Sequence, residues 1–331
     1  MLHEESIETL FKEIRSGSRR ALARAVSLVE STVVADQDLA SELLLLCNSF
    51  ASPSRRIGLT GAPGVGKSTL MESFGLALIE KGHRVAVLAV DPSSKKTGGS
   101  ILGDKLRMPH LSLHSDAFVR PSPSRLALGG TTVTTRDAIT VCEAAGYDTI
   151  FVETVGVGQS ETEVSDMVDL FLLLVLPTAG DDVQGIKRGI MEMAHALLVT
   201  KADIDDQATR IAVATYTSVL RLMIPSMEGW ATPVLPVSAL NGNGLDSLLE
   251  LVTRFFDPSS SPSIEAQRRA QRKKRFSSDL QHELMSVLRA NSSIQSIISE
   301  TEHEVLEGSI PPSVAIRQLR SRFAITISER S

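Results

Sequence analysis

The chain has 331 residues, enough for one large α/β domain with helical additions. Its 34 basic and 39 acidic residues give a net charge of -5, which argues against nucleic acid or an anionic membrane as the main partner. The longest apolar run, 170–176, is far too short to span a bilayer, and the acidic N-terminus is neither a secretory signal nor a transit peptide, so we expect a cytoplasmic protein, or a mitochondrial matrix protein if an import leader has been removed.

Residues 1–50 are predicted to form a helical extension. Three apolar stripes at helical spacing run through 5–50, which indicates helices packed on the domain that follows, and none of them carries recognisable chemistry. Cys47 in this region and Cys142 further along each lie alone in an apolar pattern, without a C-x-x-C partner or a His cluster. We expect two buried thiols in a reducing compartment.

The segment 61–68 reads G-A-P-G-V-G-K-S and fits the phosphate-binding pattern G-x-x-x-x-G-K-[ST]. It follows an apolar strand at 56–60 and opens a helix over 69–81, which is the strand, loop and helix context that the motif requires. Backbone N–H groups would surround the phosphates, Lys67 would reach the β- and γ-phosphates, and Ser68 would offer a hydroxyl to Mg²⁺. The predicted nucleotide contacts here are Gly61, Ala62, Pro63, Gly64, Val65, Gly66, Lys67, Ser68 and Thr69.

Two acidic residues that follow the next strand, 84–90, are candidate magnesium groups. Asp91 stands at the carboxyl end of that strand, where ligands bind in open α/β sheets, although a helix-capping role is the alternative. Asp104 lies in the polar, Gly-rich segment 93–105, from which it would meet the metal, or else it is a solvated loop aspartate.

The strand at 149–154 ends in E-T-V-G, the E-x-x-G form of the D-x-x-G motif of GTPases. Glu153 would hold a metal-bound water or orient the attacking water, and the Gly156 N–H would sense the γ-phosphate. Further on, the charged segment 178–189 with its three glycines suits a mobile loop, and the alternative is an ordinary strand-to-helix connection.

The run T-K-A-D at 200–203 indicates the base. The Asp203 carboxylate would accept guanine N1–H and the N2 amino group, two donors that adenine lacks. The Lys201 stem would lie over the ring. Thr200 stands where Asn is usual in this element, so the sequence does not decide whether this element is tethered to the phosphate loop. Ser238, Ala239 and Leu240 follow another apolar strand, and their backbone N–H groups would meet guanine O6.

These elements together predict an α/β P-loop NTPase over 51–257, with a mostly parallel central sheet flanked by helices and with helical N- and C-terminal extensions. A linker-like composition from 257 to 262 leads into a C-terminal helical region, 258–331, which we expect to mediate dimerisation. A basic run begins there at Arg268. It is interpreted as a solvated helix face, with a nucleic-acid contact as the alternative.

Long strings in the chain resemble the MeaB/ArgK/MMAA family of GTPases over about 56–251. They are D-P-S-S-K-K-T-G-G-S-I-L-G-D-K from Asp91, F-V-R-P-S-P-S from Phe118, C-E-A-A-G-Y-D from Cys142, V-E-T-V-G-V-G-Q-S-E-T-E-V from Val152 and D-V-Q-G-I-K-R-G from Asp182. The resemblance implies a Mg²⁺-dependent enzyme that hydrolyses GTP to GDP. It also implies a homodimer that acts as a chaperone of adenosylcobalamin-dependent methylmalonyl-CoA mutase. At 124–130 the chain departs from the family's string, with an added Arg125 and a lost glycine.

Carried onto this sequence, the resemblance assigns catalysis and metal binding to a small set of side chains. The catalytic residues are Lys67, Glu153, Asp91 and Asp104, and the metal ligands are Ser68, Asp91, Asp104 and Glu153. The mobile loop that couples nucleotide state to the partner contains Asp181, Gln184 and Lys187.

Two other functions remain as alternatives. One is a kinase or ATPase component of lysine, arginine and ornithine transport, against which Asp203 argues because an ATP-using kinase needs no guanine selectivity. The other is a GTPase metallochaperone, against which the absence of a spaced cluster among the seven histidines argues.

Overall fold

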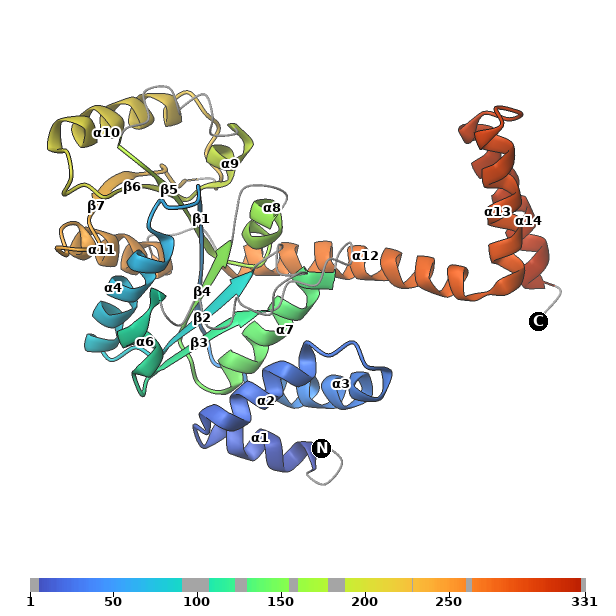
Figure 1. Ribbon diagram of the computed structural model, residues 1–331, viewed down its shortest axis with the longest axis horizontal. Coiled ribbons are helices and arrows are strands. Elements are labelled where there is room, and N and C mark those ends of the chain that lie inside the picture. Colours follow the sequence, from blue (N-terminus) through green and yellow to red (C-terminus); the bar gives the residue numbers. More distant parts are fainter. Residues whose placement is uncertain are drawn as a thin grey trace. The chain divides into compact units, whose positions relative to one another are not determined.

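The computed structural model describes residues 6–90, 107–122, 130–154, 160–177, 188–227, 229–259 and 264–328 (Figure 1). The chain divides into two compact units, Met1–Arg268 and Arg269–Ser331. Among the described residues, no helix combines the length and the apolarity needed to cross a bilayer.

The first unit is built on a seven-stranded sheet in the order β3-β2-β4-β1-β5-β6-β7, and every pairing in it is parallel. The predicted α/β fold with a mostly parallel sheet is confirmed. The strands are β1 (Arg55–Gly61), β2 (Val85–Val90), β3 (Ala117–Ser122), β4 (Thr149–Thr154), β5 (Leu170–Val175), β6 (Ala196–Thr200) and β7 (Val234–Val237).

Both faces of the sheet are covered, which explains why the strands read as continuous apolar runs. Along β2, Val85 and Val87 belong to an apolar cluster that includes residues of α4, α6 and α11, whereas Ala86 and Leu88 belong to one that includes residues of α7 and the N-terminal helices. Figure 1 shows these two helical layers on either side of the sheet. The helices described in this unit before α12 are α1 (Ile7–Arg15), α2 (Arg19–Val29), α3 (Val34–Ser49), α4 (Lys67–Glu80), α6 (Pro109–Leu113), α7 (Gly130–Ala144), α8 (Ser160–Ser165), α9 (Arg188–Met193), α10 (Asp206–Leu220) and α11 (Leu245–Phe256).

Strand β3 was not predicted from the sequence. It contains Pro121, which cannot donate a backbone hydrogen bond and therefore argues against a central strand. In the structure β3 lies at the edge of the sheet and pairs only with β2 among the described strands, where Pro121 stands opposite Ala89. An edge position tolerates proline, because one side of the strand needs no partner.

The N-terminal helices are joined to the sheet through polar as well as apolar contacts. The Arg120 guanidinium of β3 donates to the Ala23 carbonyl at 3.1 Å and to Glu30 Oε2 at 2.6 Å, both on or just after α2. Cys47 and Cys142 are both buried, as predicted, and lie in the same apolar cluster between α3 and α7. Burial raises the pKa of the Cys47 thiol to about 12 and raises that of Cys142 as well.

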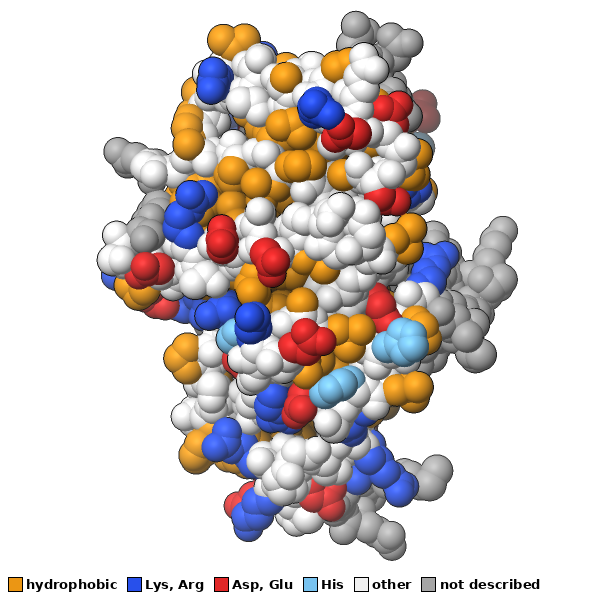
Figure 2. Space-filling model, turned by 90° about the vertical axis from the view of Figure 1, so that its left-hand side faces the viewer, with side chains coloured by type: hydrophobic (Ala, Val, Ile, Leu, Met, Phe, Trp, Pro, Cys, Tyr) orange, Lys and Arg blue, Asp and Glu red, His pale blue; other side chains and the backbone are white. Residues whose placement is uncertain are grey.

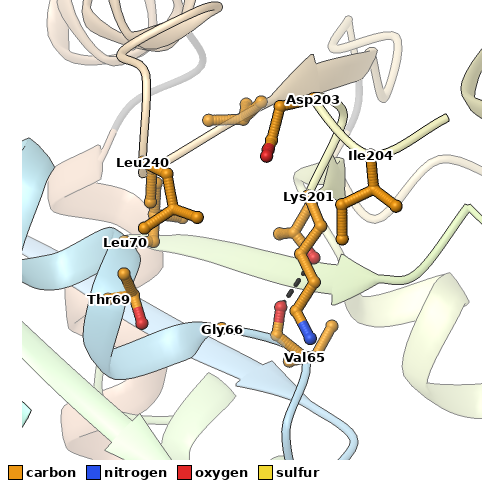
Figure 3. Close-up of a pocket in the computed structure, with 11 residues that line it drawn as sticks. Val65, Gly66, Thr69, Leu70, Lys201, Asp203, Ile204 and Leu240 are labelled. Atoms are coloured by element: carbon orange, nitrogen blue, oxygen red, sulfur yellow. Dashed lines mark hydrogen bonds between the residues drawn. The ribbon is translucent and has the colours of Figure 1, made fainter. Parts of the chain in front are cut away.

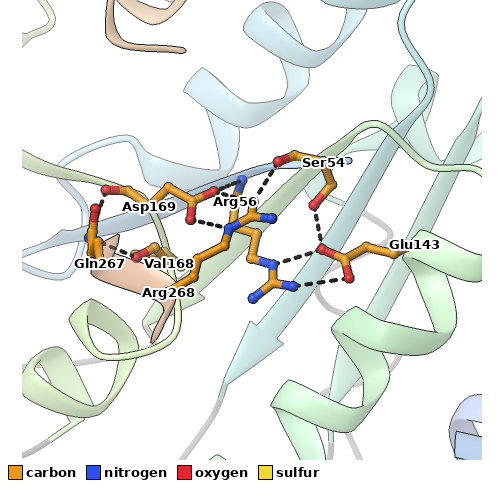
Figure 4. Close-up of polar contacts among 7 residues, drawn as sticks. All are labelled: Ser54, Arg56, Glu143, Val168, Asp169, Gln267 and Arg268. Carbon is orange, nitrogen blue, oxygen red and sulfur yellow. Dashed lines mark hydrogen bonds and ion pairs between the residues drawn. The ribbon is translucent and has the colours of Figure 1, made fainter. Parts of the chain in front are cut away.

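A buried polar cluster lies at the amino ends of β1 and β5, the edge of the sheet opposite the phosphate loop (Figure 4). We call it the amino-edge network; its members are Ser54, Arg56, Glu143, Asp169 and Arg268. The Arg268 guanidinium donates two hydrogen bonds, of 2.8 and 2.7 Å, to the Asp169 carboxylate. It also donates to the Ser54 carbonyl at 2.6 Å. The Arg56 guanidinium likewise donates two hydrogen bonds, of 2.7 and 3.0 Å, to the Glu143 carboxylate. The Arg56 backbone N–H donates to the Asp169 carboxylate at 3.0 Å.

The prediction that the basic run forms a solvated face is therefore wrong for its first member, Arg268. Its side chain is largely buried against a fully buried Asp169, and hydrogen bonds and attraction from that carboxylate raise the pKa of Arg268 in spite of the desolvation that opposes the shift. The following residues Arg269, Arg272 and Lys273 are exposed.

The second unit is helical. Helix α12 (Ile264–Ala290) begins in the first unit and continues into the second, and α13 (Ser292–Leu306) and α14 (Pro312–Ser328) follow. Asn291 caps α13 by accepting from two of its first N–H groups. On α12, apolar side chains recur every four residues, and Phe276, Leu280 and Leu284 are exposed.

Charges of both signs are interspersed on the face drawn in Figure 2, where Lys and Arg side chains alternate with Asp and Glu. Hydrophobic side chains gather between them in the upper half of this view. Exposed apolar residues near the carboxyl ends of β6 and β7 include Ile204 and Leu240.

Candidate nucleotide site

The phosphate loop connects β1 to α4 in a conformation that its glycines make possible. Gly61 has φ of +148°, and a Cβ atom there would lie 2.5 Å from the Leu174 carbonyl of β5, so a side chain does not fit. Gly66, with φ of +101°, precedes the first residue of α4. The N-terminus of this helix presents free N–H groups and a partial positive charge, which together favour a phosphate group.

Lys67 is the first residue of α4 and folds back over the loop. Its ammonium donates to the Gly61 carbonyl at 2.8 Å and to the Ala62 carbonyl at 3.3 Å. Only 7% of the residue's surface is exposed, and burial lowers the pKa of Lys67, while the nearby Glu153 carboxylate opposes that shift. A cation is thus held at the loop in a poorly solvated position, where it acts strongly on a negative charge.

Glu153 and Ser68 meet beside this lysine. In the parallel register of β1 and β4, Glu153 pairs with Leu59, two residues before the loop begins. The Ser68 hydroxyl donates to Glu153 Oε1 at 3.3 Å, and 4% of Glu153 is exposed. A hydroxyl and a carboxylate side by side are hard oxygen donors, the type that Mg²⁺ prefers.

These two groups fit a magnesium ion but do not complete its shell. Within the part of the chain that the structure describes, no group of three or more His, Cys, Asp or Glu side chains is placed to hold a metal. Mg²⁺ commonly keeps several waters and binds substrate phosphates in addition to one or two carboxylates, so a pair of protein donors is a sufficient protein contribution.

The second half of the site is a cavity of about 270 Å³ beside the phosphate loop (Figure 3). It opens between the carboxyl ends of β6 and β7 and the start of α4, which places it at the edge of the sheet where parallel-sheet proteins bind ligands. Its lining residues are Val65, Gly66, Thr69, Leu70, Thr200, Lys201, Asp203, Ile204, Val237, Ala239 and Leu240.

Asp203 is held at this cavity by Ser238, from the loop 238–244 after β7, which we call the base-side loop. The Ser238 hydroxyl donates to Asp203 Oδ1 at 2.5 Å, which fixes the carboxylate and leaves its second oxygen for another donor. Lys201 has φ of +55°, the one described non-glycine residue with a positive φ. A strained backbone at a loop that lines a cavity is typical of binding sites.

Thr200 joins the two halves of the site. Its hydroxyl donates to the Val65 carbonyl in the phosphate loop at 2.7 Å and lies 3.1 Å from the Val175 carbonyl at the end of β5. The side chain is buried. The tether between base element and phosphate loop, which the sequence left open, is therefore present with threonine in the usual place of asparagine.

The loop after β7 has one feature that changes the expected donor set. The Ser238 N–H is occupied by the Asn243 carbonyl at 2.8 Å, so Ala239 and Leu240 supply the remaining backbone N–H groups of the S-A-L segment. Asn243 was not predicted as part of the site, although N-G-N-G at 241–244 is a run of turn residues that marks a shaped loop. At Gly244 a Cβ atom would lie 2.2 Å from the Pro236 carbonyl.

The structure thus brings together the predicted side chains at the carboxyl ends of β1, β4, β6 and β7. Six predicted residues lie outside the described residues, so their proposed roles stay predictions: Asp91, Asp104, Gly156, Asp181, Gln184 and Lys187.

Comparison with known families supplies the identity. Residues 22–293 match the family described as methylmalonyl Co-A mutase-associated GTPase MeaB. The chain belongs to this family. It is accordingly a P-loop GTPase, an enzyme that hydrolyses GTP.

Relatives of this MeaB-family GTPase carry several names. GTPase ArgK of Escherichia coli (strain K12) is 40% identical over 96% of this chain and 97% of its own length. The mitochondrial methylmalonic aciduria type A homolog of Mus musculus is 42% identical over 96% of this chain and 79% of its own length. A solved structure described as a LAO/AO transport system kinase is 34% identical, covers 98% of this chain and 99% of its own, and superposes with a TM-score of 0.79.

Proposed function

We propose that this protein is a GTP-hydrolysing chaperone of adenosylcobalamin-dependent methylmalonyl-CoA mutase. Binding and hydrolysis of GTP would be coupled to delivery of the cofactor and to protection of the mutase. The family match and the mitochondrial relative support the partner. The observation that carries guanine recognition is the Asp203 carboxylate, held by Ser238 at a cavity that adjoins the phosphate loop.

The hydrolytic step follows from the side chains beside the loop. Lys67 would stabilise negative charge as the γ-phosphate is transferred, because its ammonium already lies buried at the loop carbonyls. Glu153 would orient the attacking water from the adjacent strand end. Ser68 and Glu153 would hold Mg²⁺, which, when bound, neutralises charge on the β- and γ-phosphates.

The acidic residues outside the described ranges complete the proposal. Asp91 and Asp104 would join the magnesium shell through waters, and the Gly156 N–H would sense the γ-phosphate. The loop with Asp181, Gln184 and Lys187 would change conformation with the nucleotide and act on the mutase. It directly follows β5, the strand that neighbours β1 and thus the phosphate loop.

The C-terminal helices are proposed to form a homodimer. Phe276, Leu280 and Leu284 expose 69, 45 and 54% of their surface on one helix, a periodic apolar stripe that a second copy would cover. Sedimentation analysis should report a dimer for the wild type and a monomer for Leu284→Glu. A wild-type monomer at micromolar concentration would refute this part of the proposal.

We place the protein in the cytoplasm, or in the mitochondrial matrix if it is imported.

The steady-state rate of GTP hydrolysis, with and without purified methylmalonyl-CoA mutase, tests the proposal. We expect stimulation by the mutase with GTP and none with ATP. A rate of GTP hydrolysis that does not change when the mutase is added would support the GTPase activity but refute the mutase as its partner. Asp203→Asn serves as the specificity control, since it should weaken the binding of GTP far more than that of ATP.

A second candidate, a kinase of a transport system, comes from the name of the solved structure. A kinase would transfer the γ-phosphate to a protein or small-molecule acceptor rather than to water. Radiolabelled GTP and ATP distinguish the two, because a hydrolase releases all of its label as inorganic phosphate. Preference for ADP over GDP would favour the kinase.

A further inference from the structure

Ser73 makes a hydrogen bond from the phosphate-binding helix to the base-side loop. It lies in the second turn of α4, and its hydroxyl donates to the Ala239 carbonyl at 2.7 Å. The acceptor within its own helix, the Thr69 carbonyl, lies further away at 3.2 Å. A hydroxyl has one proton, so the shorter contact to Ala239, 166 residues distant in the chain, is the dominant one.

The bond controls the direction of a backbone donor in the S-A-L segment. The Ala239 carbonyl and the Leu240 N–H belong to one planar trans peptide group, in which they point in opposite directions. Holding the carbonyl on α4 therefore fixes where the Leu240 N–H points. Within the described residues, no acceptor of the protein takes that N–H, and both Ala239 and Leu240 line the cavity.

The remainder of the loop is anchored independently of Ser73. Ser238 is fixed through its hydroxyl on Asp203 and its N–H on Asn243, and Gly244 packs against the Pro236 carbonyl. These contacts hold both ends of the loop. Ser73 supplies the contact at its centre.

We propose that Ser73 is a positioning residue for guanine O6, acting through the Ala239–Leu240 peptide without touching the nucleotide. The inference rests on the proposed guanine site. It divides base recognition into two parts: Asp203 reads the N1 and N2 side of the ring, and the peptide held by Ser73 reads O6.

Binding of four probes to Ser73→Ala, measured by calorimetry, tests this division. GDP and inosine diphosphate both carry O6, so the affinity for each should fall by about three- to tenfold, the effect of losing one neutral hydrogen bond. Their ratio should not change, because it depends on the N2 amino group that Asp203 reads. Binding of ADP and of inorganic pyrophosphate should also stay as in the wild type.

Two further variants separate positioning from general damage. Ser73→Thr keeps the hydroxyl and should restore GDP affinity. Ser41→Ala removes a helix hydroxyl whose described hydrogen bond is local, to the Gln37 carbonyl at 2.8 Å, and should leave all four affinities unchanged. Alanine favours helix over serine, which offsets part of the stability lost with the hydrogen bond to Ala239, so the melting temperature of Ser73→Ala should change little.

The outcomes distinguish the inference from the function on which it rests. GDP and inosine diphosphate binding that is unchanged in Ser73→Ala would overturn the inference, as would an equal loss for all four probes, which would indicate a disturbed helix. A wild type that binds ADP as tightly as GDP would instead overturn the guanine assignment, and this inference with it.

Discussion

The amino-edge network offers a quantitative test of how Arg268, at the end of the first unit, is held against the sheet. Asp169 is fully buried and accepts three hydrogen bonds, two from Arg268 and one from the Arg56 backbone N–H. The perturbation is a double-mutant cycle with Asp169→Leu, Arg268→Met and the two combined. Each replacement is apolar and keeps much of the volume of the residue that it removes.

The single variants should each be more damaging than the pair. Arg268→Met leaves a buried carboxylate with one described donor, and Asp169→Leu leaves a largely buried guanidinium without its counter-ion. Removing one partner of a buried ion pair costs about 3–5 kcal/mol. In the double variant only the Arg56 N–H and the Ser54 carbonyl lose their hydrogen-bond partners, which should lower the free energy of unfolding by about 1–3 kcal/mol.

Urea unfolding followed by tryptophan fluorescence measures these differences. Trp230 is the single tryptophan of the sequence, 5% of it is exposed, and it lies in the same unit as the network. Arg210→Met breaks an exposed i,i+4 pair with Asp206 and is the control, with an expected change within about 0.5 kcal/mol. A double variant as unstable as the sum of its singles would refute the argument that the ion pair must be kept or lost as a unit.

Three further predictions concern single residues. Thr200→Val removes the donor to the Val65 carbonyl and should weaken GDP binding about three- to tenfold by calorimetry, whereas Thr200→Ser should not; equal affinities would show that the tether is dispensable. Gly61→Ala should abolish GDP binding and lower the melting temperature, because no Cβ atom fits 2.5 Å from the Leu174 carbonyl. Burial lowers the pKa of His195 from 6.5 to about 4, so the unfolded state binds the extra proton first and stability should fall by up to about 3 kcal/mol as the pH drops from 6.5 to 4. His195→Asn, which keeps an acceptor for the Phe171 N–H, should flatten that slope in urea unfolding; an unchanged slope would exclude His195 as its origin.

The sequence predicted those parts of the site that depend on spacing along the chain. Between β1 and α4, five residues of a glycine-rich loop leave little conformational choice, so the positions of Lys67 and Ser68 follow from the motif. Continuous apolar runs predict buried parallel strands. Because the carboxyl ends of parallel strands meet at one edge of the sheet, the polar residues that end these runs are predicted to lie together. That edge is where Glu153, Asp203 and the phosphate loop are found.

Contacts between distant segments were not predictable in the same way. Arg268 stands in a row of basic residues, and nothing in their spacing distinguishes the one that enters the core beside Asp169 from those that stay in water. Ser73 is one of several helix serines, and its bond to Ala239 depends on how closely α4 packs on a loop 166 residues away. Such pairs are set by tertiary packing, which a single sequence does not encode in any local pattern.

Threonine can take the place of asparagine at position 200 because of where the hydroxyl lies. An asparagine amide reaches one bond further from the backbone than a threonine hydroxyl, so threonine requires the loop to lie closer to β6. The structure meets that requirement with 2.7 Å between the Thr200 hydroxyl and the Val65 carbonyl. The same hydroxyl lies within 3.1 Å of the Val175 carbonyl, at the end of the strand that leads to the proposed mobile loop. One buried proton donor therefore touches the base element, the phosphate loop and the exit of β5, so a movement in any of the three changes the environment of the other two.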